Sequence, residues 1–265
     1  KWERSRLREY LGGSSSLFTS VILCTPPPPS PLGSHNAITY CLDMNDRSPV
    51  DLTQPDLLQK LDKYMKPLIR PFVYKWAVTQ ERTIRQQLDS GVRYCDLRIA
   101  RRPNDSSGDL CFYHGVYTAL TVETVLMEIR EWLDAHPKEV LILSFSHFLG
   151  LSQELHALLL ATIRNAFTSK LCPKTEELTL RNLWASGYNV IVSYEHNICS
   201  CHGDLWPHIP YWWANKCKAE ALIEDFEHRK QHGRPGTEVH PTRSTGAPLD
   251  SFCCPQRSHV GWAHF

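Results

Sequence analysis

GVRYCDLRI, at positions 91–99, is the stretch around which the rest of the chain can be organised. It begins with a glycine and continues as a mostly apolar run, which is typical of a buried strand. Side chains two residues apart on a strand point to the same side, so Asp96 and Arg98 share one face. Burying two charged groups costs free energy unless they contact each other or a ligand. The pair therefore indicates a functional position or a buried ion pair.

Two histidines lie near the ends of other short segments. His35 stands in GSHN at positions 33–36, and His114 stands in the run CFYHG at positions 111–115. Two histidines, an arginine and a carboxylate supply what phosphodiester cleavage needs. One imidazole accepts a proton from the attacking oxygen, the other donates a proton to the leaving oxygen, and the guanidinium stabilises phosphoryl charge. A single histidine at a strand end is more often only a satisfied polar residue, so the prediction depends on the ordered set.

The composition is that of a soluble globular protein. The chain has 265 residues, of which 42% are hydrophobic and 22% charged, and this length is ample for one sizeable core. A formal net charge of +1 gives no reason to expect nucleic acid as a partner. No apolar run is long enough to cross a bilayer, so the cytoplasm is the expected location, with the nucleus left open. The 10 cysteines are scattered through apolar segments, and we expect most of them to be reduced and buried.

Strands and amphipathic helices alternate along the middle of the chain. The clearest helix covers residues 121–136, where apolar side chains recur at the spacing of one helix face. The pattern predicts a parallel α/β fold, with functional residues at the carboxyl ends of the strands. Further helices are expected over residues 48–62, 79–88, 155–167, 178–185 and 219–229, and strands over 91–99, from Leu110, and over 140–143 and 190–192.

The chain divides into three regions. Residues 1–30 are rich in proline and serine and predict a leader without regular structure, and residues 237–265 predict an irregular tail. Residues 31–236 form the predicted globular domain. A faint likeness of the first residues to a signal peptide is outweighed by Glu3 and Glu9, and by the absence of a clear cleavage site.

The motifs at positions 33–36, 91–98 and 113–115 resemble those of the phosphatidylinositol-specific phospholipase C X domain. KWAVTQ at 75–80 and the stretch LWP…PYWW at 205–213 resemble, more particularly, a small animal subfamily of X-domain-containing proteins. The resemblance runs from about Gly33 to Gly236 and implies a distorted TIM barrel. It also implies a phosphoric diester hydrolase that cleaves phosphatidylinositol, at a membrane surface that it engages transiently, to diacylglycerol and inositol cyclic phosphate.

The resemblance assigns a role to each of five residues. His35 matches the general base that deprotonates the inositol 2-hydroxyl, and His114 matches the general acid on the leaving oxygen. Arg98 matches the residue that neutralises the transition state, and Asp96 matches a carboxylate that orients the cluster. Asn36, together with Arg98, is expected to contact the substrate, although an asparagine here can also be only a turn residue.

The resemblance also bears on metal binding. Relatives that use calcium have an Asn after the first His and three acidic ligands. Asn36 and Asp96 fit two of these positions, but Arg98 and Ser146 occupy the other two. A guanidinium opposes calcium, which prefers six or more oxygen ligands, so we expect a site without metal or cofactor. Bacterial members without a metal have Asp at the position of Asn36, so this residue departs from their pattern.

Two further segments have an ordinary interpretation that we favour. HNICSCH at 196–202 lacks the usual spacing of zinc ligands and is expected to be a surface loop. Trp206, Trp212 and Trp213 are residues that could enter a membrane interface, but packing on the rim of the barrel is the favoured interpretation.

Both ends of the domain depart from the family. Members of the family continue past the position of Gly236. In them, one late strand brings the carboxylate that orients the first histidine. Asp250 of this chain is a poor candidate for that carboxylate. The residues before Pro31 lack the apolar strand that should precede His35. We therefore expect a truncated or alternatively spliced form, with the barrel incomplete after residues 190–194, His35 unpartnered and activity impaired. The alternative function is a non-catalytic module that binds an inositol phosphate head group.

Overall fold

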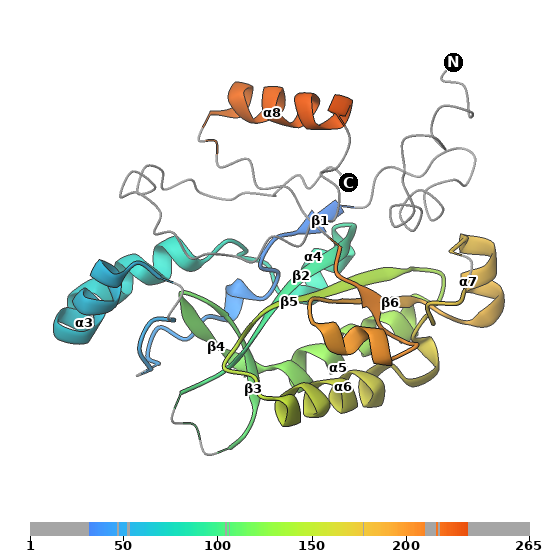
Figure 1. The fold of residues 1–265 in the computed structure, drawn as a ribbon, viewed down its shortest axis with the longest axis horizontal. Helices are drawn as coiled ribbons and strands as arrows, with labels where there is room; N and C mark the ends of the chain where they lie inside the picture. Colours follow the sequence, from blue (N-terminus) through green and yellow to red (C-terminus); the bar gives the residue numbers. More distant parts are fainter. Residues whose placement is uncertain are drawn as a thin grey trace.

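A mixed sheet with helices packed against it forms the centre of the molecule (Figure 1). The computed structural model describes residues 32–209, apart from 47, 52, 53, 104, 106 and 177, together with 216 and 218–232. The predicted leader at 1–30 and the predicted tail at 237–265 lie outside the described residues. The described strands are β1 (Leu32–Ser34), β2 (Val92–Arg101), β3 (Leu110–His114), β4 (Val116–Thr121), β5 (Leu141–Leu149), β6 (Val190–Tyr194) and β7 (Trp206–Pro207).

Helices occupy most of the connections between the strands. Four of them begin at a threonine or serine whose side chain accepts a hydrogen bond from the first turn, as at Thr83, Thr121, Ser152 and Thr179. No described helix is both long and apolar enough to span a membrane. The helices are α3 (Asp56–Ala77), α4 (Ile84–Asp89), α5 (Val122–Ala135), α6 (Gln153–Phe167), α7 (Leu180–Ser186) and α8 (Ala219–His232).

The order of the strands is β4-β3-β2-β5-β6-β7, with β1 paired to β2 beside this path. Over the described residues the sheet is open, because β4 and β7 stand at its two ends and do not pair with each other. The predicted α/β class is confirmed, and so is the prediction that the barrel does not close within the described part of the chain. Truncation or splicing as its cause stays a prediction.

The strand directions correct one prediction. β1, β5, β6 and β7 run parallel to their neighbours, but β3 is antiparallel to both β2 and β4. A single glycine, Gly115, separates β3 from β4, so these two strands form a hairpin and not the crossover that a parallel pair requires.

The position of Asp96 corrects a second prediction. Asp96 lies in the middle of β2, which continues to Arg101, and not at the carboxyl end of that strand as predicted.

The two faces of β2 have different surroundings. Cys95, Leu97 and Ile99 belong to the main core, which the sheet shares with α4, α5 and α6. The intervening residues point to the opposite face, where Tyr94 packs in a smaller cluster and Asp96 and Arg98 follow it. This alternation, predicted from the sequence, places the charged pair on the face opposite to α4, α5 and α6.

Two helices begin at least about five residues later than the sequence pattern predicted. The helix expected at 48–62 is α3, which begins at Asp56 and extends to Ala77, through Pro67 and Pro71, with a kink at Met65, where the backbone is not helical. The helix expected at 79–88 begins at Ile84, because Thr83 and Gln86 form a reciprocal capping box there. The strand before His35, which the sequence did not predict, exists as β1.

Candidate active site

The site lies where one edge of β2 changes its partner. β5 pairs with β2 along residues 94–100, so β1 and β3 must share the other edge. β1 pairs with β2 up to Cys95, and β3 pairs with it from Ile99 onward. Along this edge of β2, β1 approaches residues 96–98 from one end and β3 approaches them from the other, and both strands end there. His35 directly follows β1 and His114 ends β3, so both histidines reach the level of Asp96.

His35 is hydrogen-bonded to Asp96. Its Nδ1 atom lies 3.0 Å from Oδ2 of Asp96. The carboxylate accepts the Nδ1 proton, so the lone pair of the neutral ring is on Nε2, where the amide of Asn36 donates at 3.1 Å. The prediction of an unpartnered His35 is therefore wrong: a strand in the middle of the sheet supplies the carboxylate that we expected from a later segment.

Asn36 turns the chain toward this carboxylate. Its φ of 46° is uncommon for a residue other than glycine, and asparagine is among the few that tolerate it. In this conformation its backbone N–H donates to Oδ2 of Asp96 at 3.2 Å, and the next N–H, of Ala37, donates to the Asp96 carbonyl at 3.0 Å. Asn36 is thus both a turn residue and a neighbour of the site.

Asp96 is buried but remains ionised. Burial pushes its pKa up, but the hydrogen bond with His35 and the positive charge of Arg98 hold the pKa well below its usual range. Nε of Arg98 lies 3.6 Å from Oδ2, and Ser146 Oγ donates to Oδ1 at 3.3 Å. Asp96 therefore forms a partly buried ion pair with Arg98, and it also accepts a hydrogen bond from His35.

His114 faces His35 across the site. The two ring centroids are 6.4 Å apart, and the rings are nearly perpendicular. Nδ1 of His114 donates to the carbonyl of Ala77 at 2.7 Å, which leaves Nε2 as the second nitrogen of this ring. Burial and, to a smaller extent, the charge of Arg98 lower the pKa of His114 to about 4, although the hydrogen bond to Ala77 acts in the opposite direction. The ring is therefore neutral near pH 7 when no anion is bound.

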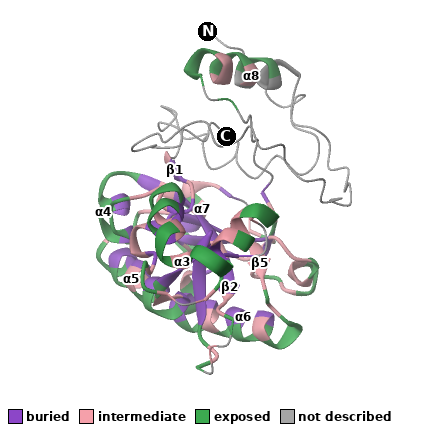
Figure 2. Cartoon of the chain, turned by 90° about the vertical axis from the view of Figure 1, so that its left-hand side faces the viewer, coloured by how far each residue is buried: buried purple, intermediate pink, exposed green. Residues whose placement is uncertain are grey.

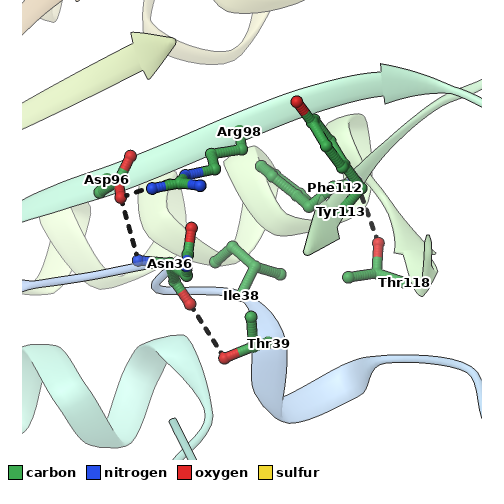
Figure 3. A pocket seen from close by; sticks show the side chains of 8 residues that line it. All are labelled: Asn36, Ile38, Thr39, Asp96, Arg98, Phe112, Tyr113 and Thr118. Atoms are coloured by element: carbon green, nitrogen blue, oxygen red, sulfur yellow. Dashed lines mark hydrogen bonds and ion pairs between the residues drawn. The ribbon is translucent and has the colours of Figure 1, made fainter. Parts of the chain in front are cut away.

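A small pocket opens beside the Asp96–Arg98 pair (Figure 3). Oδ1 of Asn36 and Nε of Arg98 are buried and have no hydrogen-bond partner among the described residues, although Arg98 keeps its ion pair. Unsatisfied buried polar groups cost free energy, so these two atoms are available to a ligand that carries charge and hydroxyl groups. The pocket is lined by Asn36, Ile38, Thr39, Asp96, Arg98, Phe112, Tyr113 and Thr118.

The backbone of His35 is held by the end of α3 and the residues after it. Thr79 Oγ1 and Gln80 Nε2 donate to the His35 carbonyl at 3.1 and 3.0 Å. Trp76 stacks on the ring of His114, with a centroid separation of 5.2 Å. These residues lie in the KWAVTQ motif, which therefore positions both histidines.

Sequence reasoning missed part of the site. Behind Ser146, Nδ1 of His147 lies 3.0 Å from its Oγ, and Glu195 accepts a hydrogen bond from the His147 N–H at 2.7 Å. Asp51 accepts from the N–H of Gly115 at 2.8 Å and so fixes the turn after His114. Ser146 was noticed only for its place in a calcium pattern, and no local pattern pointed to Asp51 or Glu195.

The other predicted positions have varied outcomes. Trp206 is buried and packs in the smaller cluster, whereas Trp212 and Trp213 lie outside the described residues, as does Asp250. Within 196–202 the chain forms a short 3₁₀ helix, Asn197–Cys201, and the ring of His196, which precedes it, stacks on His156. In the described part of the chain, no group of three or more His, Cys, Asp or Glu side chains is arranged to hold a metal ion.

Comparison with known proteins finds a family that part of this chain matches. Residues 74–186 match the family described as phosphatidylinositol-specific phospholipase C, X domain. PI-PLC X domain-containing protein 1 of Homo sapiens is 50% identical over 205 residues, which are 77% of this chain and 63% of the relative. Human protein 2 is 37% identical over 195 residues, 72% of this chain and 62% of the relative. The motifs at 75–80 and 205–213 predict the second member of this subfamily, but the identity to the first member is higher.

The chain spans slightly less than two thirds of the length of these curated relatives. Among solved structures, the phosphatidylinositol-specific phospholipase C of Listeria monocytogenes is 18% identical, with a TM-score of 0.43 over 71% of this chain and 55% of that chain. The enzyme of S. aureus is also 18% identical, with a TM-score of 0.46 over 69% of this chain and 53% of that chain.

Proposed function

This chain contains a phosphatidylinositol-specific phospholipase C X domain and is a homologue of the PI-PLC X domain-containing proteins 1–3, and on that premise we propose that it is a phosphodiesterase that cleaves phosphatidylinositol or a related lipid. One observation carries the proposal. Two imidazole rings face each other at 6.4 Å, and one of them is paired at 3.0 Å with a carboxylate that also contacts Arg98.

The proposed reaction is an internal transfer to the inositol 2-hydroxyl. A proton passes from that hydroxyl to Nε2 of His35, and the oxygen forms a bond to phosphorus. The bond from phosphorus to the diacylglycerol oxygen breaks, and that oxygen takes a proton from Nε2 of His114. The products are diacylglycerol and an inositol cyclic phosphate.

Asp96 and Arg98 have separate parts in this scheme. The Asp96 carboxylate holds the tautomer of His35 in which Nε2 is unprotonated, and it stabilises the imidazolium that forms. The Arg98 guanidinium neutralises charge that develops on the phosphoryl oxygens. Because Arg98 already places a positive charge beside Asp96, we propose that the reaction needs no metal ion.

His114 must gain a proton before it can act as the acid. In the ligand-free state its pKa is about 4, so very little of it is protonated near pH 7. A bound phosphodiester brings a negative charge close to the ring, and a nearby opposite charge favours the protonated form. Substrate binding is therefore proposed to charge His114 and so to complete the site.

The low pKa of His114 also favours a second candidate function. A neutral ring beside Arg98 and Asn36 can hold an inositol phosphate head group without donating a proton to a leaving group. In this case head-group binding should survive His35→Ala, and the unmodified chain should form no product.

The deciding assay uses vesicles that contain phosphatidylinositol, with a calcium chelator present and 31P NMR as the readout. We expect inositol cyclic phosphate from the unmodified chain and about a hundredfold lower rate for His35→Ala or His114→Ala. His228→Ala, on the exposed surface of α8, is the matched control and should keep the full rate. No product, or product formed only after calcium is restored, would contradict the proposal.

A further inference from the structure

A second carboxylate lies behind the proposed general acid. Asp51 is 1% exposed, and its Oδ2 atom accepts a hydrogen bond at 2.8 Å from the backbone N–H of Gly115, the residue directly after His114. The N–H of Asp51 in turn donates to the carbonyl of Gly115 at 3.0 Å. Two hydrogen bonds in opposite directions therefore join Asp51 to the turn that carries His114.

The turn between β3 and β4 is packed closely against α3. Gly115 has a φ of 75°, a left-handed conformation that glycine adopts without strain. A Cβ atom at this position would lie 3.6 to 3.7 Å from Val73, Ala77 and Trp76. Figure 2 shows the exposed side of α3 in front of the buried strands of the sheet. The parts of α3 that contact the His114 ring, the Ala77 carbonyl and the Trp76 ring, are neutral.

Asp51 is itself held firmly in place. The side-chain amide of Gln54 donates to its Oδ2 atom at 3.2 Å, and the backbone N–H of Gln54 donates to its carbonyl at 3.1 Å. Val50, the preceding residue, is buried in an apolar cluster with α3, and its N–H donates to the Asp62 carboxylate at 3.1 Å. The position of the Asp51 carboxylate is therefore set by contacts on both sides of it.

The positive groups on the other side of the His114 ring oppose its protonation. Arg98 carries a positive charge, and His35 gains one when it accepts the proton of the substrate hydroxyl. Asp96, the carboxylate on that side, already contacts both groups, with Oδ2 3.0 Å from Nδ1 of His35 and 3.6 Å from Nε of Arg98. The charge of Asp96 is therefore largely offset by these two groups.

Asp51 acts on the ring from a different direction. Burial has the largest effect on the pKa of His114 and lowers it, whereas the negative charge of Asp51 raises it. Burial and, after it, the charge of Asp51 also raise the pKa of Tyr113 and the pKa of Tyr117. The charge of Asp51 thus acts on three groups of the hairpin, in a buried region where water screens charges weakly.

We propose that Asp51 is a positioning residue for the general acid: its carboxylate fixes the turn after His114 and favours the protonated form of the His114 ring. This inference rests on the proposed function, because the charge has a catalytic task only if His114 donates a proton. Each histidine of the site then has its own carboxylate. Asp96 contacts His35 directly, and Asp51 acts on His114 from behind the Gly115 N–H.

Asp51→Asn separates the charge from the hydrogen bond, because an amide oxygen can still accept from the Gly115 N–H. The rate is measured from pH 5 to pH 8 on a short-chain phosphatidylinositol kept below its micelle concentration. The variant should lose about threefold or more in kcat at pH 8, where protonated His114 is scarce, and should approach the unmodified chain at the acid end. The same loss at every pH would mean that Asp51 only holds the turn, and this would overturn the proposal.

Two further variants accompany this experiment. Asp105→Asn is the matched control, because Asp105 also accepts a backbone N–H, from Ser107 at 2.9 Å, but lies in the loop between β2 and β3. It should keep the rate and the pH profile of the unmodified chain. Gln54→Lys places a cation beside Asp51 from a half-buried position and leaves the Asp51 side chain intact. It should change the pH profile in the same direction as Asp51→Asn.

NMR of the His114 ring nitrogens in the ligand-free chain tests the proposal without turnover. At pH 4.5 about a quarter of the His114 rings of the unmodified chain should be protonated, and Asp51→Asn should lower this fraction about threefold. An unchanged fraction would overturn the proposal. A lowered fraction in a chain that cleaves no substrate would support the action of Asp51 on His114 and would count against the proposed function alone.

Discussion

Nδ1 of His35 lies 3.0 Å from Oδ2 of Asp96, and the two residues belong to neighbouring parallel segments of the sheet. His35 directly follows the last residue of β1, and Asp96 lies in β2. The pairing of β1 with β2 places these two positions beside each other. The pair therefore depends on the register between β1 and β2, which the buried residues on either side of it fix.

The first prediction concerns this pair. Asp96→Asn should lower the rate of phosphatidylinositol cleavage by a factor of about a hundred to ten thousand, because an amide does not hold the reactive tautomer of His35 or stabilise its protonated form. Measured kcat should fall while the circular dichroism spectrum stays unchanged. Asp134→Asn, which removes a carboxylate from an exposed ion pair, serves as the control and should keep full activity. A drop of less than threefold for Asp96→Asn would show that another group orients His35.

The second prediction assigns Ser146 as a positioning residue. Its hydroxyl donates to Oδ1 of Asp96, so Ser146→Ala should allow the carboxylate to move and should lower kcat by about fivefold, the equivalent of one hydrogen bond of about 1 kcal/mol. Ser144 is also buried, two residues earlier on β5, and Ser144→Ala is the matched control. If both variants lose the same activity, the effect is one of packing and the assignment is wrong.

The third prediction follows from the protonation of His114. The free protein has a His114 pKa of about 4, and the acid must be protonated to act. Because kcat/KM reports the free enzyme, it should fall as pH rises above about 4, whereas the corresponding limb of kcat should lie at higher pH, since bound phosphate raises the pKa. Rates on a soluble short-chain substrate, measured from pH 4 to pH 8, would show this separation. Coincident limbs near the ordinary histidine value would contradict it.

The fourth prediction concerns stability in acid. The pKa of His114 is about 4 in the folded protein against 6.5 for the free side chain, so between these values the unfolded chain binds a proton that the folded chain does not. Stability should therefore fall as pH drops from 6.5 toward 4, with a contribution from His114 of at most about 3 kcal/mol. Urea unfolding at pH 7 and pH 4.5 should show a smaller loss for His114→Gln than for the unmodified chain. An equal loss in both would mean that other groups cause it.

Local pattern was sufficient to predict much of the fold. The two-residue alternation of β2 correctly separated Asp96 and Arg98 from the main core, and apolar spacing located α5 and α6 to within two residues. Among the described cysteines, Cys95, Cys111 and Cys172 are buried as expected, whereas Cys41 and Cys199 are half-buried and Cys201 is exposed. These features depend on neighbours within one element, so the sequence contains them directly. The choice of candidate residues came from their ordered motifs in the same way.

Three features were decided only by the tertiary structure. The partner of His35 is Asp96 because β1 and β2 pair in one particular register, and strand pairing between distant segments leaves no local pattern. His114 reaches the same site because β3 reverses direction after a polar loop, whereas the alternation of strands and helices predicted a parallel sheet. Tyr64 and Phe72 of α3 face outward because Asp62 and Arg70 find partners 12 or more residues upstream, at Val50, Ser48 and Asp46. The spacing of apolar residues along α3 is the same whether Tyr64 and Phe72 are buried or exposed, so only the contacts of the opposite face could decide which side of the helix points to the core.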